Sequence, residues 1–97
     1  MGRAYADIIG EKLDGYTGKV TDDDIGTYYR VRDVFAKQEV RERLIQYAED
    51  GWQVFIDADD FQRLAWDYQE QVEAFGDEYI SDWFHDESVK RGILVEA

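Results

Sequence analysis

Apolar residues recur at helical spacing along residues 58–75, and this is the clearest pattern in the chain. The members share one arc of a helix: Phe61, Leu64, Ala65, Tyr68, Val72 and Phe75. Asp57 precedes the stripe as a predicted N-cap, and Gly76 follows it as a predicted stop. The pattern therefore predicts a helix from about Ala58 to Phe75 that buries this stripe.

A shorter helix and two strands are predicted around it. Residues 77–87 place three apolar side chains inward (Ile80, Trp83 and Phe84) and three acids outward (Glu78, Asp82 and Asp86). Residues 52–56 (WQVFI) have the composition and alternation of a strand. Gly92 ends the last helical region, and we expect residues 93–95 (ILV) to pair with that strand.

Three helices are predicted in the first half. The first covers residues 4–13 and stops at Gly15, and the second begins at an N-cap, Thr21. Its apolar positions then shift by roughly a quarter-turn at about 100° per residue, so we expect a break or bend near residues 36–38 and a third helix to about Glu49. Residues 27–35 (TYYRVRDVF) are rich in aromatic and β-branched residues, so a strand is the alternative there.

Together these elements predict an α+β fold, with about four to five helices packed on a small two- to three-stranded sheet. The chain has 97 residues, is 44% hydrophobic and shows neither an internal repeat nor a linker, so we expect residues 1–97 to form a single acidic interaction domain. It contains no cysteine, and no apolar run approaches the roughly 20 residues that span a bilayer. We expect a cytoplasmic protein with no membrane partner (host-cell cytoplasm if the chain is phage-encoded).

The negative charge is concentrated in the second half of the chain. The formal net charge is −12, and residues 57–87 carry eleven carboxylates against a single cation, Arg63. Because the same residues hold the helical apolar stripe, they are expected to fold rather than to form a solvated tail. Such a one-sided field repels nucleic acid and attracts basic partners.

Enzymatic and metal-binding arrangements are poorly matched. His85 is the only histidine, and neither serine lies in a nucleophile-elbow context. Asp82 and His85 have a metal-site spacing but lack a second histidine, so His85 is expected on the surface. Two acidic runs, at residues 22–24 and 57–60, depart from the calcium-loop pattern. We therefore expect no enzyme activity, no cofactor and no metal.

Direct binding to nucleic acid is not expected either. A basic cluster does occur in the first half: Arg30, Arg32, Lys37, Arg41 and Arg43. Acids interleave with it and form helical pairs such as Glu39–Arg43. With a net charge of −12, the phosphate-neutralising contribution to binding has the wrong sign.

The outer side of the 58–75 helix is the candidate binding site. Trp66 lies there among charged residues and is either an interface anchor or a packing residue, since tryptophan is enriched at binding hot spots. The candidate partner-binding residues are Asp59, Asp60, Trp66, Asp67, Glu70, Glu73, Asp77, Glu78, Asp82 and Asp86. If the two acidic helices were collinear, they would form a rod of carboxylates about 40 Å long.

Residues 57–87 (DADDFQRLAWDYQEQVEAFGDEYISDWFHDE), with the chain's size and acidity, resemble the small DNA-mimic inhibitors of phages and mobile elements, the anti-CRISPR and anti-restriction proteins. The resemblance covers about a third of the chain and is compositional, with no motif matched residue by residue. It implies a non-enzymatic inhibitor that docks on a basic DNA- or RNA-binding surface, such as that of a CRISPR effector complex or a restriction enzyme. The alternative is an acidic structural or regulatory adaptor (antitoxin-like, chaperone-like or virion protein) that acts as a protein-binding dimer.

Overall fold

Four helices and a two-stranded sheet make up the described part of the chain. The computed structural model describes residues 4–18 and 28–96. The elements, in chain order, are α1 (Tyr5–Thr17), α2 (Tyr28–Glu49), β1 (Gln53–Val54), α3 (Ala58–Phe75), α4 (Ile80–Lys90) and β2 (Leu94–Val95). The predicted mixture of helices and a small sheet is thus confirmed in outline, but the described chain is mostly helical.

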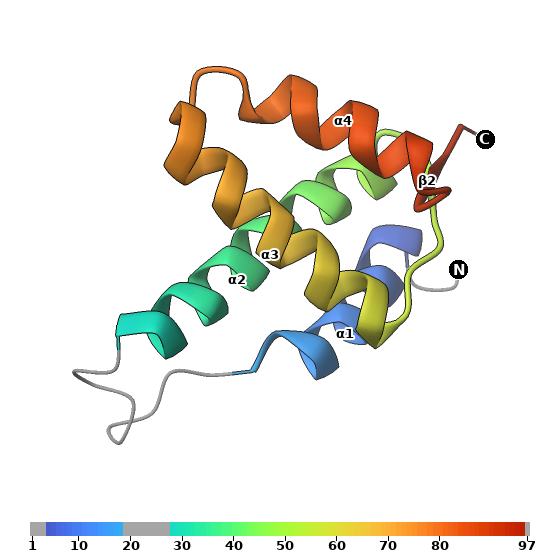
Figure 1. The fold of residues 1–97 in the computed structure, drawn as a ribbon. Coiled ribbons are helices and arrows are strands. Elements are labelled where there is room, and N and C mark those ends of the chain that lie inside the picture. Colours follow the sequence, from blue (N-terminus) through green and yellow to red (C-terminus); the bar gives the residue numbers. More distant parts are fainter. Residues whose placement is uncertain (1–3, 19–27, 97) are drawn as a thin grey trace.

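The long helix α2 lies at the centre of the arrangement (Figure 1). α1 packs against it, α3 crosses it, and α4 folds back from the end of α3. Every element contributes side chains to one core: Ile9, Leu13, Val40, Leu44, Val54, Phe61, Leu64, Tyr68, Ile80, Phe84 and Leu94. Within residues 4–18 and 28–96, no helix combines the length and the apolarity that crossing a bilayer requires.

α2 is one continuous helix, so the expected break near residues 36–38 and the separate third helix are wrong, whereas a bend within the helix stays a prediction. Its buried side chains are Val34, Ala36, Val40, Leu44 and Ala48, whereas Phe35 is exposed. The buried side shifts along the helix because α2 contacts both α1 and α3. Residues 28–49 also contain neither proline nor glycine, the residues that commonly interrupt the hydrogen bonding of a helix.

The first half differs from expectation in two other places. The strand alternative for residues 27–35 is wrong from Tyr28 onwards, because α2 begins there. The helix start predicted at Thr21 lies outside the described residues. α1 continues through Gly15 to Thr17, whose hydroxyl donates to the Leu13 carbonyl at 2.8 Å. It ends at Gly18, whose positive φ of 76° suits glycine.

The predicted strand pairing is confirmed, although the strands are shorter than expected. β1 and β2 are antiparallel, with Gln53 opposite Val95 and Val54 opposite Leu94. Val54 and Leu94 are buried, and Phe55, which follows β1, is exposed. The hydroxyl of Tyr5 on α1 accepts from the Val54 amide at 2.9 Å and donates to the Val54 carbonyl at 3.3 Å.

α3 and α4 form a helical hairpin rather than a rod, which corrects the collinear arrangement considered for the two acidic helices. α3 ends at Gly76, whose φ is 75° and whose N–H donates to the Val72 carbonyl at 2.8 Å. α4 then begins at Ile80, three residues later than expected, and the two helices contact each other. Because α4 folds back from the end of α3 (Figure 1), the acids of the two helices do not extend along one line.

Candidate functional site

The helix α3 supplies the scaffold of the candidate site. Its N-terminus is fixed by Asp57, whose carboxylate accepts a hydrogen bond from the Asp60 amide at 2.8 Å, as predicted. Phe61 and Leu64 are fully buried on its inner side. Because Asp59 and Asp60 lie in the first turn, their charge also interacts favourably with the positive end of the helix dipole.

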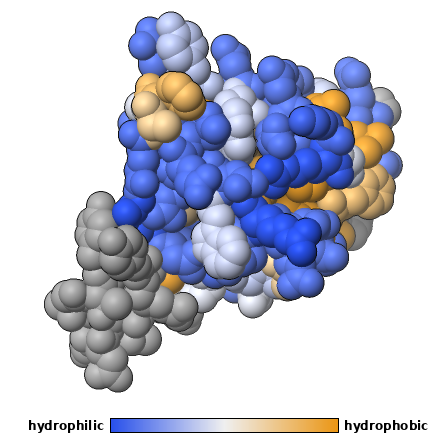
Figure 2. All heavy atoms as spheres, viewed as in Figure 1, coloured by the Kyte–Doolittle hydropathy of each residue, from blue (hydrophilic) through white to orange (hydrophobic). Residues whose placement is uncertain are grey.

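Seven of the predicted acids are exposed, and none of them forms an ion pair with another described residue. We call this set the acidic surface: Asp59, Asp60, Glu70, Asp77, Glu78, Asp82 and Asp86. The side of the molecule that α3 and α4 share is mainly hydrophilic in Figure 2, which has the viewpoint of Figure 1. These carboxylates are therefore available to an external cation.

Two predicted site residues are partly neutralised within the fold. Asp67 accepts from Arg91 at 2.5 Å, and Arg91 also pairs with Glu87 at 3.0 Å. Burial lowers the pKa of the Arg91 guanidinium, but these two carboxylates outweigh it and raise that pKa. Glu73 forms an ion pair with Arg32 of α2. These ion pairs could not be predicted from the sequence, because Arg91 and Arg32 are distant from Asp67 and Glu73 along the chain. The paired residues meet only when the helices pack.

Trp66 is both a packing residue and an exposed one. Its ring is 54% exposed, while its indole N–H donates to Asp33 of α2 at 3.0 Å. Asp33 also accepts from Gln62 at 3.1 Å and pairs with Lys37 at 2.9 Å. Burial raises the pKa of the Asp33 carboxyl, but the hydrogen bonds from Lys37, Gln62 and Trp66 prevail and lower it. The indole is thus held in place by a carboxylate that remains ionised.

The surroundings of Trp66 are mixed in charge. A hollow of about 540 Å³ beside it is lined by Asp60, Arg63, Trp66, Asp67 and Arg91. Two guanidinium groups therefore lie close to the predicted anchor. A cationic side chain of a partner would meet repulsion as well as attraction there.

Exposed aromatic residues where α3 turns into α4 were missed by the sequence pattern. Phe75 was expected in the core, but it is 69% exposed, and Tyr79 is 63% exposed. The apolar period continues to Phe75, but the chain turns at Gly76 and leaves the last turn of α3 without a neighbour over that ring. The composition of residues 75–79 (FGDEY), with two aromatics around a glycine and two acids, is the signal that could have indicated a loop surface.

His85 lies in an aromatic cluster and not on an open surface as expected. Its Nδ1 is 3.0 Å from the Tyr47 hydroxyl, and its ring stacks on Tyr47 and meets the edge of Trp52. Burial is the main cause that raises the pKa of Tyr47. The Tyr47 hydroxyl and His85 Nδ1 are hydrogen-bond partners of each other, and among the described contacts no serine or carboxylate bonds to the imidazole.

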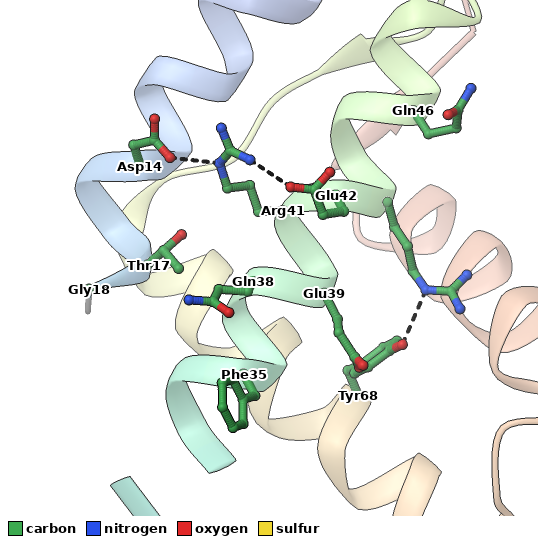
Figure 3. Close-up of a pocket in the computed structure, with 11 residues that line it drawn as sticks. Asp14, Thr17, Gly18, Phe35, Gln38, Glu39, Arg41, Glu42, Gln46 and Tyr68 are labelled. Atoms are coloured by element: carbon green, nitrogen blue, oxygen red, sulfur yellow. Dashed lines mark hydrogen bonds and ion pairs between the residues drawn. The ribbon is translucent and has the colours of Figure 1, made fainter. Parts of the chain in front are cut away.

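A broad hollow of about 1050 Å³ between α1, α2 and α3 has charged walls (Figure 3). Arg41 pairs with Asp14 and Glu42, both at 2.8 Å, and Arg43 donates to the Tyr68 hydroxyl at 3.2 Å. The expected Glu39–Arg43 pair is not formed; Arg43 bonds to Tyr68 and Ser81 instead. Across residues 4–18 and 28–96, no group of three or more potential ligands could hold a metal ion. The Arg41–Asp14 pair joins α2 to α1, and the Arg43–Tyr68 hydrogen bond joins α2 to α3.

Comparison with protein-family models, with curated proteins and with solved structures gave no significant match to this chain.

Proposed function

We propose that this protein is a non-enzymatic inhibitor that mimics nucleic acid and docks on the basic DNA- or RNA-binding surface of another protein. The observation that supports this proposal is the acidic surface, seven exposed carboxylates that form no ion pair within the described chain. Carboxylates accept hydrogen bonds from the same guanidinium and ammonium groups that bind phosphates. The compositional resemblance suggests a CRISPR effector complex or a restriction enzyme as the target.

The rigidity of the surface is also suited to mimicry. Five of the seven carboxylates lie on helices that are anchored to the core through Phe61, Leu64 and Phe84, all fully buried. Binding therefore does not require a flexible acidic chain to become ordered. The loss of conformational entropy in such ordering would reduce affinity. Association would be fast and steered by charge, so affinity should fall steeply as the salt concentration rises.

Capture and competition test the proposal. The immobilised protein is exposed to a bacterial lysate at low salt, and the retained proteins are eluted with double-stranded DNA or with RNA and identified by mass spectrometry. We expect the retained proteins to be nucleic-acid-binding proteins, and we expect added DNA or RNA to release them from the immobilised protein. Retained proteins that nucleic acid cannot displace would contradict mimicry.

A pair of double charge reversals provides a matched control. Glu70→Lys with Asp82→Lys changes the acidic surface, whereas Glu49→Lys with Glu96→Lys makes the same change in net charge at exposed positions outside it. We expect the first variant to lose the captured partner and the second to retain most of it. Equal losses would indicate a response to net charge alone. Circular dichroism would verify that both variants fold.

The dimeric adaptor is a second candidate, because an exposed apolar surface near the sheet could be a dimer interface. Exposed apolar side chains occur near the sheet (Phe55, Val89 and Val95), and Figure 2 shows orange surface gathered on the side where β2 lies. Such a patch can be covered by a second copy of the chain. Light scattering after gel filtration tests this candidate: the adaptor predicts a dimer that Phe55→Glu converts to a monomer, and a monomeric parent protein would exclude it.

A further inference from the structure

A small aromatic hollow lies where α3 turns into α4. Its walls include Phe75, Tyr79 and Trp83, which we call the aromatic corner, and its volume is about 70 Å³. This is several times the roughly 15 Å³ that one water needs. Phe75 and Tyr79 are 69% and 63% exposed, so their rings remain open to a partner. Figure 2 shows a pale orange island on a blue surface at this turn.

Three carboxylates of the acidic surface lie close in sequence to the aromatic corner. Asp77 and Glu78 lie in the turn between its rings, and Asp82 immediately precedes Trp83. All three are exposed and take no part in the ion pairs found among the described residues. In the described chain, no arginine or lysine lines the hollow at the corner, whereas Arg63 and Arg91 line the hollow beside Trp66. A cation therefore finds a more favourable environment at the corner than at Trp66.

The fold already places one of its own guanidinium groups in comparable surroundings. Arg43 lies over the rings of Tyr68 and Phe84, at 5.6 and 5.9 Å from the ring centroids. It also donates to the Ser81 hydroxyl at 2.9 Å. Aromatic faces combined with oxygen acceptors thus hold an arginine inside this protein. The aromatic corner offers the same two kinds of group to the outside.

We propose that the aromatic corner anchors an arginine side chain of the basic partner, an inference that rests on the proposed function. The planar guanidinium stacks on aromatic rings while its N–H groups donate to carboxylates, here those of Asp77, Glu78 or Asp82. An ammonium group has no such plane and keeps its hydration more strongly. The site should therefore prefer arginine to lysine at equal charge.

A titration with capped hexa-arginine and hexalysine peptides at low salt, followed by amide and indole NMR spectra, tests this inference. We expect hexa-arginine to bind more tightly than hexalysine and to shift the resonances of residues 75–83, including the Trp83 indole. Binding that shifts residues 59–70 and leaves 75–83 unchanged would overturn the aromatic corner and leave the proposed function intact. Failure of both peptides to bind would count against both proposals.

Substitution of two phenylalanines that are both more than half exposed gives the matched comparison. Phe75→Ala and Tyr79→Ala should each weaken hexa-arginine binding about two- to fivefold, the size of an exposed cation–π contact. Phe55→Ala removes a ring that is 56% exposed near the sheet and should leave binding unchanged. Tyr79→Phe, which retains the ring, should preserve affinity. Equal effects of Phe75→Ala and Phe55→Ala, with thermal unfolding unchanged in both, would refute the anchor.

Discussion

The indole N–H of Trp66 donates to the Asp33 carboxylate at 3.0 Å and joins α3 to α2. This bond should contribute about 1 kcal/mol, because its acceptor is charged but lies close to solvent. A double-mutant cycle with Trp66→Phe and Asp33→Ala, followed by urea unfolding, measures the coupling. Independent effects of the two substitutions would show that the bond does not stabilise the fold.

The ionisation of Asp33 should make part of the stability depend on pH. Its pKa is lower in the folded chain than the ordinary value of 3.8, so the ionised form favours folding. This contribution is complete above 3.8 and is lost as the pH falls through the lower folded value. The stability difference between the parent protein and Asp33→Asn should therefore be larger at about pH 6 than at about pH 2.

Urea unfolding of the parent protein and Asp33→Asn at the two pH values measures this difference. A difference in stability that is the same at both pH values would contradict the assignment.

Three glycines should respond differently to alanine. Gly15 is inside α1 with nothing within 4 Å of an added Cβ, so Gly15→Ala should stabilise by about 0.5–1 kcal/mol through helix propensity. At Gly10 the new Cβ would lie 3.3 Å from Arg41 and 3.4 Å from Ile45, so the gain should be smaller. Gly76→Ala should destabilise, because φ is 75° there. Thermal unfolding distinguishes the three, and an equal gain at Gly10 and Gly15 would refute the close contact.

The Ser88 hydroxyl should be dispensable. It is fully buried, and its Oγ finds no hydrogen-bond partner among the described residues. Ser88→Ala should therefore leave the free energy of unfolding within about 0.5 kcal/mol of the parent value or increase it. Thr17→Val is the comparison, because it removes a buried hydroxyl that does bond, to Leu13, and should destabilise. A large loss in Ser88→Ala alone would mean that a bound water satisfies the hydroxyl.

Local patterns predicted local structure well in this chain. The cap at Asp57, the stop at Gly76 and the pairing of the two strands all follow from residues close in sequence or from strong strand composition. The continuity of α2 could not be predicted in this way, because a helix with two packing partners does not keep one apolar stripe. For the candidate site, the exposure of most acids could be predicted from their angular positions around the helix axis. The Arg32–Glu73 and Arg91–Asp67 pairs did not, since they depend on how the helices cross.

The Tyr5 hydroxyl has a consequence for how the molecule behaves at high concentration. An isolated two-stranded sheet has unprotected edges that can recruit strands from other molecules. Here one phenol takes both main-chain polar groups of Val54, the N–H and the carbonyl, so neither is offered to an incoming strand. The Tyr5 side chain thus occupies the free hydrogen-bonding groups at the edge of β1 and opposes edge-to-edge aggregation. Tyr5→Phe would remove this protection without changing the core.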